Sequence, residues 1–355
     1  MTYPRSQLVD ADNAGYYHCV SRCVRRAFLC GFDHLTGRNF DHRKGWIERR
    51  LLELAEAFAV SVFAYAVMDN HLHLVLRVDP EAPLCWDDSE VARRWLMVFP
   101  GRLGKSADSM ALDRAIEAIC SDPERLKELR CRLGSLSWFM RALNEPIARR
   151  ANREDKCSGR FWEGRFKCQA LLDERAVLSC MAYVDLNPVR AGMCDRIADC
   201  EHTSIRRRLA VDTGEQDNCS SDRASPGRPL KPVAGLTVDD LLGLTEASYI
   251  ELVQWTGEQA WPGKRGRLPT AADPVPDAVL ATARPAGSDS HSDQPTIRTC
   301  SRAWLRQVKG TESLYYRAIG SAEAMITKAT DMGQRWLKGV SRARISSLTR
   351  RQAAS

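Results

Sequence analysis

Residues 61–78 read SVFAYAVM, then DN, then HLHLVLRV, and this stretch decides the fold. Both apolar runs have the length of a strand, and the Asp-Asn pair tolerates the backbone angles of a tight turn. The stretch therefore predicts a β-hairpin. In its second strand, alternation places His71 and His73 on one face and the leucines on the other, so we expect the leucine face to be buried.

Elements before the hairpin suggest how the domain begins. Residues 15–22, GYYHCVSR, are aromatic and β-branched and predict a strand. Apolar residues then recur at helical spacing and predict an amphipathic helix from about 45 to 58. A strand, a helix and a hairpin in this order are half of a ferredoxin-like α+β domain.

Elements after the hairpin complete the predicted domain. Residues 80–136 contain several prolines and short helical pieces, which predicts a largely helical insertion. A helical face follows at 139–147, interrupted by a proline. Residues 159–172 alternate polar and apolar side chains, which predicts a strand with a basic face. A helix over 174–187 then follows its predicted N-cap, Asp173.

Composition divides the chain into two parts. Residues 1–210 form the predicted α+β domain, an antiparallel sheet with helices that carries the 80–136 insertion. Residues 211–234 are rich in Ser, Asp, Gly and Pro and predict a linker. Residues 235–355 then predict a small helical, basic accessory domain, with a helix-start pattern at Thr237-Val-Asp-Asp240.

Charge is unevenly distributed along the 355 residues. The net charge is +7, but residues 301–355 alone carry +8 and the first 300 residues carry −1. A local basic excess suits a polyanionic partner. An apolar content of 44% excludes a disordered chain and indicates one or two domains with real cores.

Other global features bear on the compartment. The longest apolar stretch, 58–68, is too short to span a membrane, and the first fifteen residues lack the pattern of a secretory signal. Thirteen cysteines without a C-x-x-C pair favour reduced thiols over a disulfide framework. We therefore expect a cytoplasmic protein with no membrane partner.

The residues that carry chemistry lie on two elements. His71 and His73 stand two apart on a strand, so their imidazoles can converge on one divalent ion; the alternative is two polar-face histidines on a half-exposed strand. Tyr183 and Asn187 stand four apart and share a helix face. A tyrosine attacks a phosphodiester only if a cation stabilises the developing charge, and Asn187 offers a neutral oxygen ligand. The alternative is a core tyrosine and a helix terminator.

Four segments occur in an order that resembles a known family. They are AGYYHCVSR, AYAVMDNHLHLVLRV, SGRFWEGRFKCQALL and YVDLNPVRAGM. In this order they resemble the REP-associated tyrosine transposases, which are single-tyrosine HUH transposases of the bacterial insertion-sequence type. The resemblance covers about 15–208 apart from 80–136, and the chain departs from short members of the family in that insertion and after residue 210.

The resemblance implies a fold, a reaction and residue roles. It implies a ferredoxin-like HUH fold and cleavage of single-stranded DNA with Mg²⁺ or Mn²⁺ through a covalent 5′-phosphotyrosine. His71 and His73 then correspond to the metal-binding histidines and Tyr183 to the nucleophile. Asn187 falls at the position of the amide ligand of the metal. His18 falls at a position beside the site, where it would contact a metal-binding residue or the phosphate.

A basic, aromatic stretch suggests where DNA binds. Residues 125–168 carry a net charge of +7. Phosphates attract guanidinium groups, and unstacked bases lie on aromatic faces. The candidate DNA-binding residues are Arg149, Arg150, Arg153, Arg160, Arg165 and Lys167, interleaved with the aromatic residues Trp138, Phe139, Phe161, Trp162 and Phe166. The alternative is a solvated basic helix with buried aromatics. The tail arginines Arg342, Arg344, Arg350 and Arg351 would add salt-dependent affinity.

Three functions follow as expectations. The first is a transposase-like enzyme that cleaves and rejoins single-stranded or hairpin-flanking DNA, with DNA hairpins or repeats as its partner. The second is a domesticated DNA-hairpin-binding protein that no longer transposes. The third is an unrelated metal-dependent phosphodiesterase that uses His71 and His73 with water as the nucleophile.

Overall fold

A central β-sheet organises the computed structural model. The structure describes residues 8–24, 29–34, 36–101, 104, 108–212, 228–238, 241, 243–259, 266–269, 275–277, 279, 297–313, 317–341 and 343–344. The sheet has the strand order β7-β4-β5-β1-β6-β8. Its strands are β1 (Gly15–Arg22), β4 (Val60–Val67), β5 (His71–Val78), β6 (Lys167–Leu171), β7 (Ala234–Gly235) and β8 (Ala318–Ile319). A separate two-stranded sheet pairs β2 (Phe32–Asp33) with β3 (Arg38–Asn39).

The four long strands have ferredoxin-like connectivity. Strand β1 pairs antiparallel with both β5 and β6, and β4 pairs antiparallel with β5. Helix α1 (His42–Ala57) connects β1 to β4, and helix α5 (Leu136–Glu154) precedes β6. Since β4 and β5 are joined by the Asp-Asn turn, the predicted hairpin and the predicted α+β fold class are confirmed.

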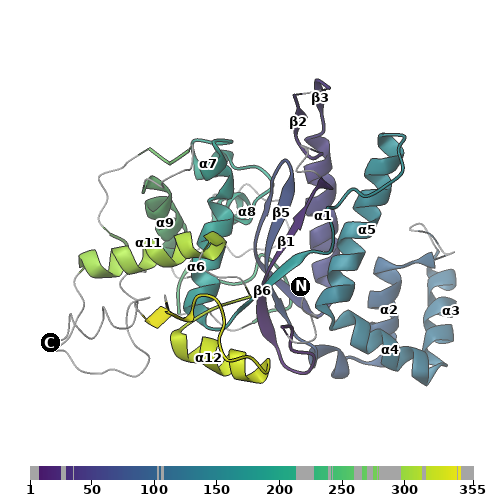
Figure 1. Cartoon of the computed structure of the whole chain (residues 1–355). Coiled ribbons are helices and arrows are strands. Elements are labelled where there is room, and N and C mark those ends of the chain that lie inside the picture. The colour runs from purple at the N-terminus through teal and green to yellow at the C-terminus, as the bar shows by residue number, and fades with distance from the viewer. Residues whose placement is uncertain are drawn as a thin grey trace.

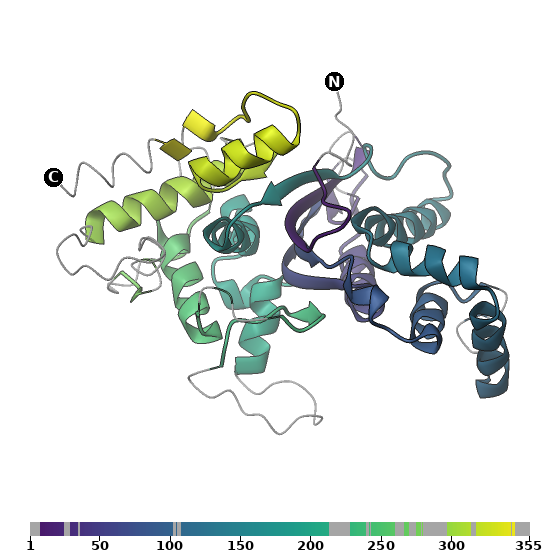
Figure 2. The ribbon, with the colours of Figure 1, turned by 90° about the horizontal axis from the view of Figure 1, so that it is seen from below.

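Helices cover both faces of the sheet, which makes three layers (Figure 1). One face carries α1, α5 and the insertion helices α2 (Asp88–Val98), α3 (Ser109–Cys120) and α4 (Pro123–Leu133). The other carries α6 (Glu174–Asp185), α7 (Asn187–Ala191), α8 (Ser204–Asp212), α9 (Glu246–Glu258) and α11 (Ile297–Ser313). Helix α12 (Ala322–Asp331) lies beside β8, away from the insertion helices (Figure 2). The predicted helical insertion is therefore present.

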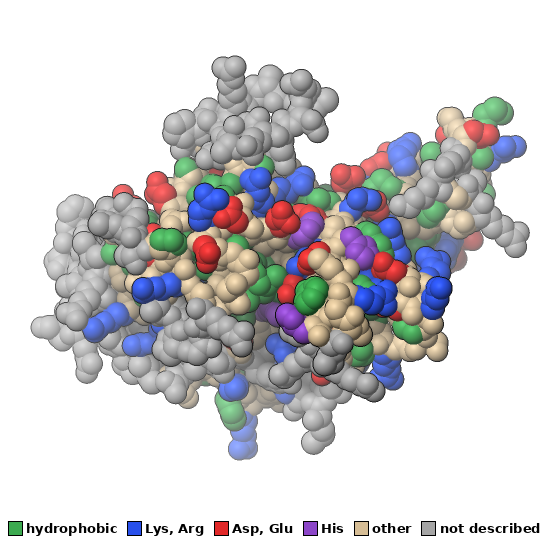
Figure 3. Space-filling view, turned by 90° about the horizontal axis from the view of Figure 1, so that it is seen from above, with side chains coloured by type: hydrophobic (Ala, Val, Ile, Leu, Met, Phe, Trp, Pro, Cys, Tyr) green, Lys and Arg blue, Asp and Glu red, His purple; other side chains and the backbone are tan. Residues whose placement is uncertain are grey.

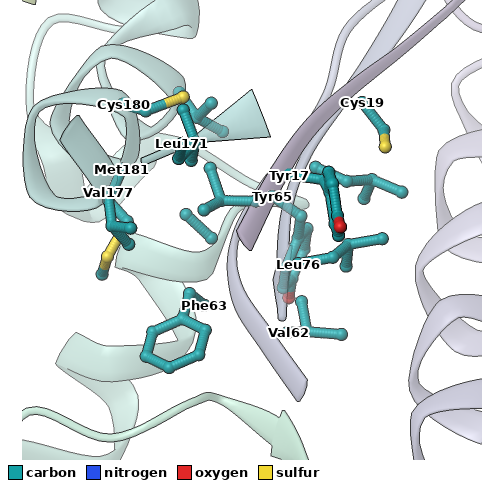
Figure 4. Close-up of a cluster of buried hydrophobic side chains, with 14 of the residues drawn as sticks. Tyr17, Cys19, Val62, Phe63, Tyr65, Leu76, Leu171, Val177, Cys180 and Met181 are labelled. Atoms are coloured by element: carbon teal, nitrogen blue, oxygen red, sulfur yellow. The ribbon is translucent and has the colours of Figure 1, made fainter. Parts of the chain in front are cut away.

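Burial on both faces explains the apolar run of the hairpin. Every residue of β4 is buried, because α1 packs on one face of the strand and α6 on the other. Figure 4 shows Phe63 on the side of Val177 and Met181 of α6, while Val62 and Leu76 point to the opposite side. A strand enclosed in this way needs apolar residues at successive positions rather than at alternate ones.

The predicted interruption of the helical segment at Pro146 is wrong, because Pro146 lies inside helix α5. The helix continues through this residue to Glu154. A proline inside a helix removes the N–H that would donate to the carbonyl four residues earlier. Here the Arg50 side chain donates from Nε to the Ala142 carbonyl at 3.3 Å. Tertiary contact thus satisfies the acceptor that the proline leaves open.

Three other element boundaries differ from the sequence-based expectation. Only Lys167–Leu171 of the predicted 159–172 strand is a strand. Asn187 does not end the preceding helix but begins α7, with Pro188 in its first turn, where a proline costs no hydrogen bond. Helix α9 starts after its N-cap Thr245, later than the helix-start pattern near residue 237 predicts. Asp173 caps α6 as predicted, accepting from the Ala176 N–H at 2.8 Å.

Cysteine pairing also differs from the expectation of reduced thiols throughout. Cys194 and Cys200 are joined by a disulfide in the segment between α7 and α8. Cys19, Cys23 and Cys30 are buried and are not disulfide-bonded. Among the helices that the structure describes, none has both the length and the apolar character needed to cross a bilayer.

The segment after residue 228 packs on the helix that carries Tyr183. Strands β7 and β8 extend the sheet at its two ends, and α11 packs along α6. Asp185 of α6 is fully buried and accepts from the Tyr249 hydroxyl of α9 at 2.6 Å and from the Ile205 N–H at 3.0 Å. Burial raises the pKa of the Asp185 carboxyl to about 6. This buried network connects α6, α8 and α9.

Most of the predicted linker and three of the four tail arginines lie outside the residues that the structure describes. Residues 213–227, and Arg342, Arg350 and Arg351, lie outside the described residues.

Loss of the Tyr249 hydroxyl should destabilise this packing. We expect Tyr249→Phe to lower the free energy of unfolding by about 1–3 kcal/mol, because Asp185 loses a donor in a site without water access. Urea denaturation measures the effect. Thr330→Ala, which removes an exposed hydroxyl from α12, is the control and should change stability by less than about 0.5 kcal/mol. Equal midpoints for Tyr249→Phe and the wild type would contradict the coupling.

Candidate active site

A cavity of about 230 Å³ opens where β1 ends and β5 begins. It brings together four residues that the sequence singles out: His71, His73, Tyr183 and Asn187. The remaining lining residues are Arg22, Met68, Asn70, Arg190, Ala191 and Glu312. Residues from the sheet, from α6 and α7 and from the distant helix α11 therefore meet in one place.

The two histidines face the cavity because of strand alternation. His71 and His73 lie on the β5 face that α6 covers, and their ring centroids are 4.8 Å apart. His73 on this face is only 3% exposed, whereas His71 at the start of the strand is partly exposed. A buried imidazole such as that of His73 requires partners for its ring nitrogens.

A hydrogen-bonded chain behind His73 supplies such a partner. His18 of β1 contacts His73 Nδ1 through Nε2 at 2.9 Å and Gln169 Oε1 through Nδ1 at 2.8 Å. Burial lowers the pKa of His18 to about 4, against the opposing effect of its hydrogen bond to Gln169, so the ring is neutral at neutral pH. With Gln169 Oε1 as acceptor, His18 Nδ1 carries the proton and Nε2 accepts from His73 Nδ1. His73 then directs the lone pair of Nε2 outward, as a metal ligand needs.

Tyr183 approaches the histidines from the last turn of α6. Its ring centroid lies 5.7 Å from that of His73 and 6.0 Å from that of His18, both edge to face. The side chain is 3% exposed. Burial raises the pKa of the Tyr183 phenol, and the negative charge of Glu312 raises it further, while Arg190 and Arg22 lower it. The phenol is therefore protonated at neutral pH.

Two arginines line the same cavity, Arg190 at a buried position and Arg22 at a partly exposed one. Arg190 of α7 is 4% exposed, and burial lowers the pKa of its guanidinium against the opposing effect of Tyr183 and Glu312. Arg22 stands opposite His71 in the pairing of β1 with β5. Its buried Nε has no hydrogen-bond partner in the described part of the chain. Guanidinium groups held in this way are suited to bind the oxygens of a phosphate.

Asn187 completes a donor set that fits a divalent cation. Its side chain is 8% exposed, and Nδ2 is buried without a hydrogen-bond partner among the described residues. Within those ranges no cluster of three or more His, Cys, Asp or Glu side chains could hold a metal ion. A metal here would therefore use the imidazoles of His71 and His73 and the amide oxygen of Asn187, leaving positions for phosphate and water.

Three charged residues that line the cavity were not predicted from the sequence. Arg190 lies within the YVDLNPVRAGM segment, two helical turns after Tyr183, and this spacing was the available signal. Arg22 ends the first strand, opposite His71. Glu312 comes from α11, more than a hundred residues later, and no pattern in the sequence connects it to the site.

The predicted DNA-binding residues lie outside the cavity. Arg149, Arg150 and Arg153 are exposed on the C-terminal half of α5, and Arg160, Arg165 and Lys167 are exposed on and after the following loop. Arg149 pairs with Glu145, and the Arg150 guanidinium lies 3.7 Å from the centroid of the Trp46 ring. Figure 3 shows acidic side chains among the lysines and arginines on the upper face, with histidines near its centre.

The loop before β6 connects these residues to the cavity. The Glu163 N–H donates to the Arg22 carbonyl at 2.8 Å, and the Val24 N–H donates to the Phe161 carbonyl at 3.0 Å. The loop therefore lies against the end of β1. The prediction that bases stack on Phe139, Phe161 and Phe166 is wrong, because these rings are buried in the core.

Comparison with known proteins gives one structural match. No family model matches the chain, and no curated protein matches it. A solved structure described as a REP-associated tyrosine transposase bound to a REP hairpin is similar to it, with 13% sequence identity and a TM-score of 0.29. The match covers 63% of this chain and 94% of that one. At this identity and TM-score, the match does not assign that protein's activity to this chain.

Metal binding tests the donor set directly. We expect the protein to bind Mn²⁺ at one site in isothermal titration calorimetry and His73→Ala to abolish this binding. His18→Ala should weaken it about 10–100-fold, because the ring of His73 loses the partner that orients it. His42→Ala is the control, since His42 pairs with Glu154 at the surface. Wild-type affinity in His73→Ala would exclude the site.

Proposed function

We propose that this protein cleaves and rejoins single-stranded or hairpin-flanking DNA, as a transposase-like enzyme with Tyr183 as its nucleophile. The observation that carries the proposal is the cavity in which Tyr183 meets His71, His73 and the arginines Arg22 and Arg190. These residues come from four different elements and have no common structural need to converge. The order of the four sequence segments described above supports the same function.

The cavity accounts for binding of the scissile phosphate. Arg22 and Arg190 place positive charge at the cavity, Arg190 at a buried position, and a phosphodiester supplies the negative charge that compensates them. When bound, a divalent metal at His71, His73 and Asn187 supplies charge stabilisation at the phosphate oxygens. A neutral His18 keeps the ring of His73 in the orientation that this requires.

Attack by Tyr183 proceeds with a balanced exchange of bonds. The Tyr183 Oη forms a bond to phosphorus as the bond from phosphorus to the 3′ oxygen breaks, and the 3′ oxygen takes a proton from water, which leaves a 5′-phosphotyrosine and a 3′-hydroxyl. The phenolic proton must leave Oη, because its pKa lies above neutral pH. Glu312 is the carboxylate of the cavity, so we assign it the role of proton acceptor.

Rejoining is the reverse of this reaction. A 3′-hydroxyl attacks the phosphotyrosine, the phosphodiester forms again and Tyr183 leaves with a proton. The energy of the broken phosphodiester is kept in the tyrosine ester, so joining needs no external energy source. One cavity thus serves both cleavage and joining, which is the chemistry that DNA transposition requires.

A tyrosine substitution tests the nucleophile. Tyr183→Phe should abolish the covalent protein–DNA adduct on denaturing gels while DNA binding, measured by fluorescence anisotropy, stays within about twofold of the wild type. Tyr17→Phe is a matched control, because Tyr17 is also 3% exposed but lies outside the cavity. We expect this variant to form the adduct normally.

Other results would favour the other functions. Cleavage that persists in Tyr183→Phe without an adduct would indicate a phosphodiesterase with water as nucleophile. Binding of DNA hairpins by the wild type without any metal-dependent cleavage would indicate a binding protein. Either result would contradict the proposal.

Removal of metal separates binding from chemistry. In EDTA we expect the adduct to disappear, because the charge on the attacked phosphate is no longer stabilised. DNA binding should persist through the arginines. Addition of Mn²⁺ should restore the adduct. Undiminished adduct formation in EDTA would show that His71 and His73 act without a metal.

A further inference from the structure

A second cavity, of about 510 Å³, lies between the insertion helices and α5. It is on the opposite side of the sheet from α6, and its walls come from α1, α2, α4 and α5. Tyr183 and the histidines of the candidate active site do not line it. Its composition points to a ligand of its own.

Three aromatic rings form one wall. The Trp95 centroid lies 5.9 Å from that of Trp138 and 4.4 Å from that of Phe99, and the Phe99 and Trp138 centroids are 6.5 Å apart. Trp95 is 7% exposed, whereas Phe99 and Trp138 are partly exposed and line the cavity. Aromatic faces of this kind bind flat, unstacked rings.

Arginines surround this wall. Four line the cavity, namely Arg50, Arg125, Arg141 and Arg149, against one acidic residue, Glu145. Arg141 and Arg149 both pair with Glu145, so a single carboxylate serves two guanidinium groups. The Arg141 guanidinium also lies 5.0 Å from the centroid of the Trp138 ring. Arg50 and Arg125 pair with Glu53 and Glu128, so the excess positive charge beside the aromatic surface comes from Arg141 and Arg149, which share one carboxylate.

We propose that this cavity binds an unpaired nucleobase and its phosphate from the same single-stranded DNA that the active site cleaves. The inference rests on the proposed function. A nucleotide combines the two features that the cavity matches, a flat ring for Trp138 and a phosphate for Arg141 and Arg149.

The course of α5 supports DNA as the occupant. Arg141, Arg149 and Arg153 lie on the same helix, eight and four residues apart, and span about 18 Å along its axis. The far end of α5 is tied to α1, because Arg43 contacts Asp155 at 2.6 Å. The next residue of α1, Lys44, contacts Asp69 at 2.6 Å, in the turn that precedes His71. These arginines thus extend toward the same end of the sheet as the active site.

Oligonucleotide length tests this placement. We propose to measure the affinity of oligo-dT of increasing length by fluorescence anisotropy. Trp138→Leu should weaken binding of long oligonucleotides about 5- to 150-fold, the range that loss of one base–aromatic stack gives. It should leave the shortest bound oligonucleotides unaffected. Trp86→Leu is the matched control, since Trp86 is a partly buried tryptophan of the same insertion outside the cavity.

An abasic series identifies the bound group. In this series, the nucleotides of a long oligonucleotide are replaced by abasic sites one at a time. At the position whose base stacks on Trp138, the wild type and Trp138→Leu should have equal affinity. Equal affinity of the two proteins for every unmodified oligonucleotide would overturn the inference. Loss of affinity in Arg141→Gln but not in Trp138→Leu would also overturn it and would indicate a site for acidic groups in general.

These outcomes are distinct from failure of the proposed function. If the wild type forms the Tyr183 adduct while Trp138→Leu binds all oligonucleotides normally, only the second cavity is wrongly assigned. If the wild type binds no single-stranded DNA of any length, both assignments are wrong.

Discussion

Burial of the histidine face of β5 is the constraint on which the site depends. A strand with His71 and His73 on one face would ordinarily turn that face to water, but α6 covers it. Imidazoles at such a position need fixed partners, and the contact of His18 with His73 provides one. The same covering helix carries Tyr183, so the element that covers the histidines also carries the proposed nucleophile.

The position of α6 depends in turn on the C-terminal segment. Asp185, two residues after Tyr183, is held by donors from α8 and α9, and α11 packs along the same helix. Glu312 of α11 reaches the cavity itself. The segment after residue 228 therefore contributes both to the packing of α6 and to the charge around the Tyr183 phenol.

Much of the central fold could be predicted from sequence, because strand alternation and turn chemistry are local. The hairpin, β1, α1 and the Asp173 cap follow from patterns within a few residues. The continuation of α5 through Pro146 could not be predicted, since the acceptor is satisfied by Arg50, nearly a hundred residues away. The burial of three phenylalanines in the basic stretch likewise depends on helices that pack from elsewhere in the chain.

The candidate site could likewise be predicted only in part from the sequence. The meeting of His71, His73, Tyr183 and Asn187 in one cavity agrees with the sequence pattern, whereas Glu312 could be found only from the fold.

The central claim is that Tyr183 becomes covalently joined to DNA. Tandem mass spectrometry of the protease-digested adduct tests it most directly. The account predicts a single 5′-phosphonucleotide on the peptide that contains Tyr183, and attachment to any other residue would contradict it.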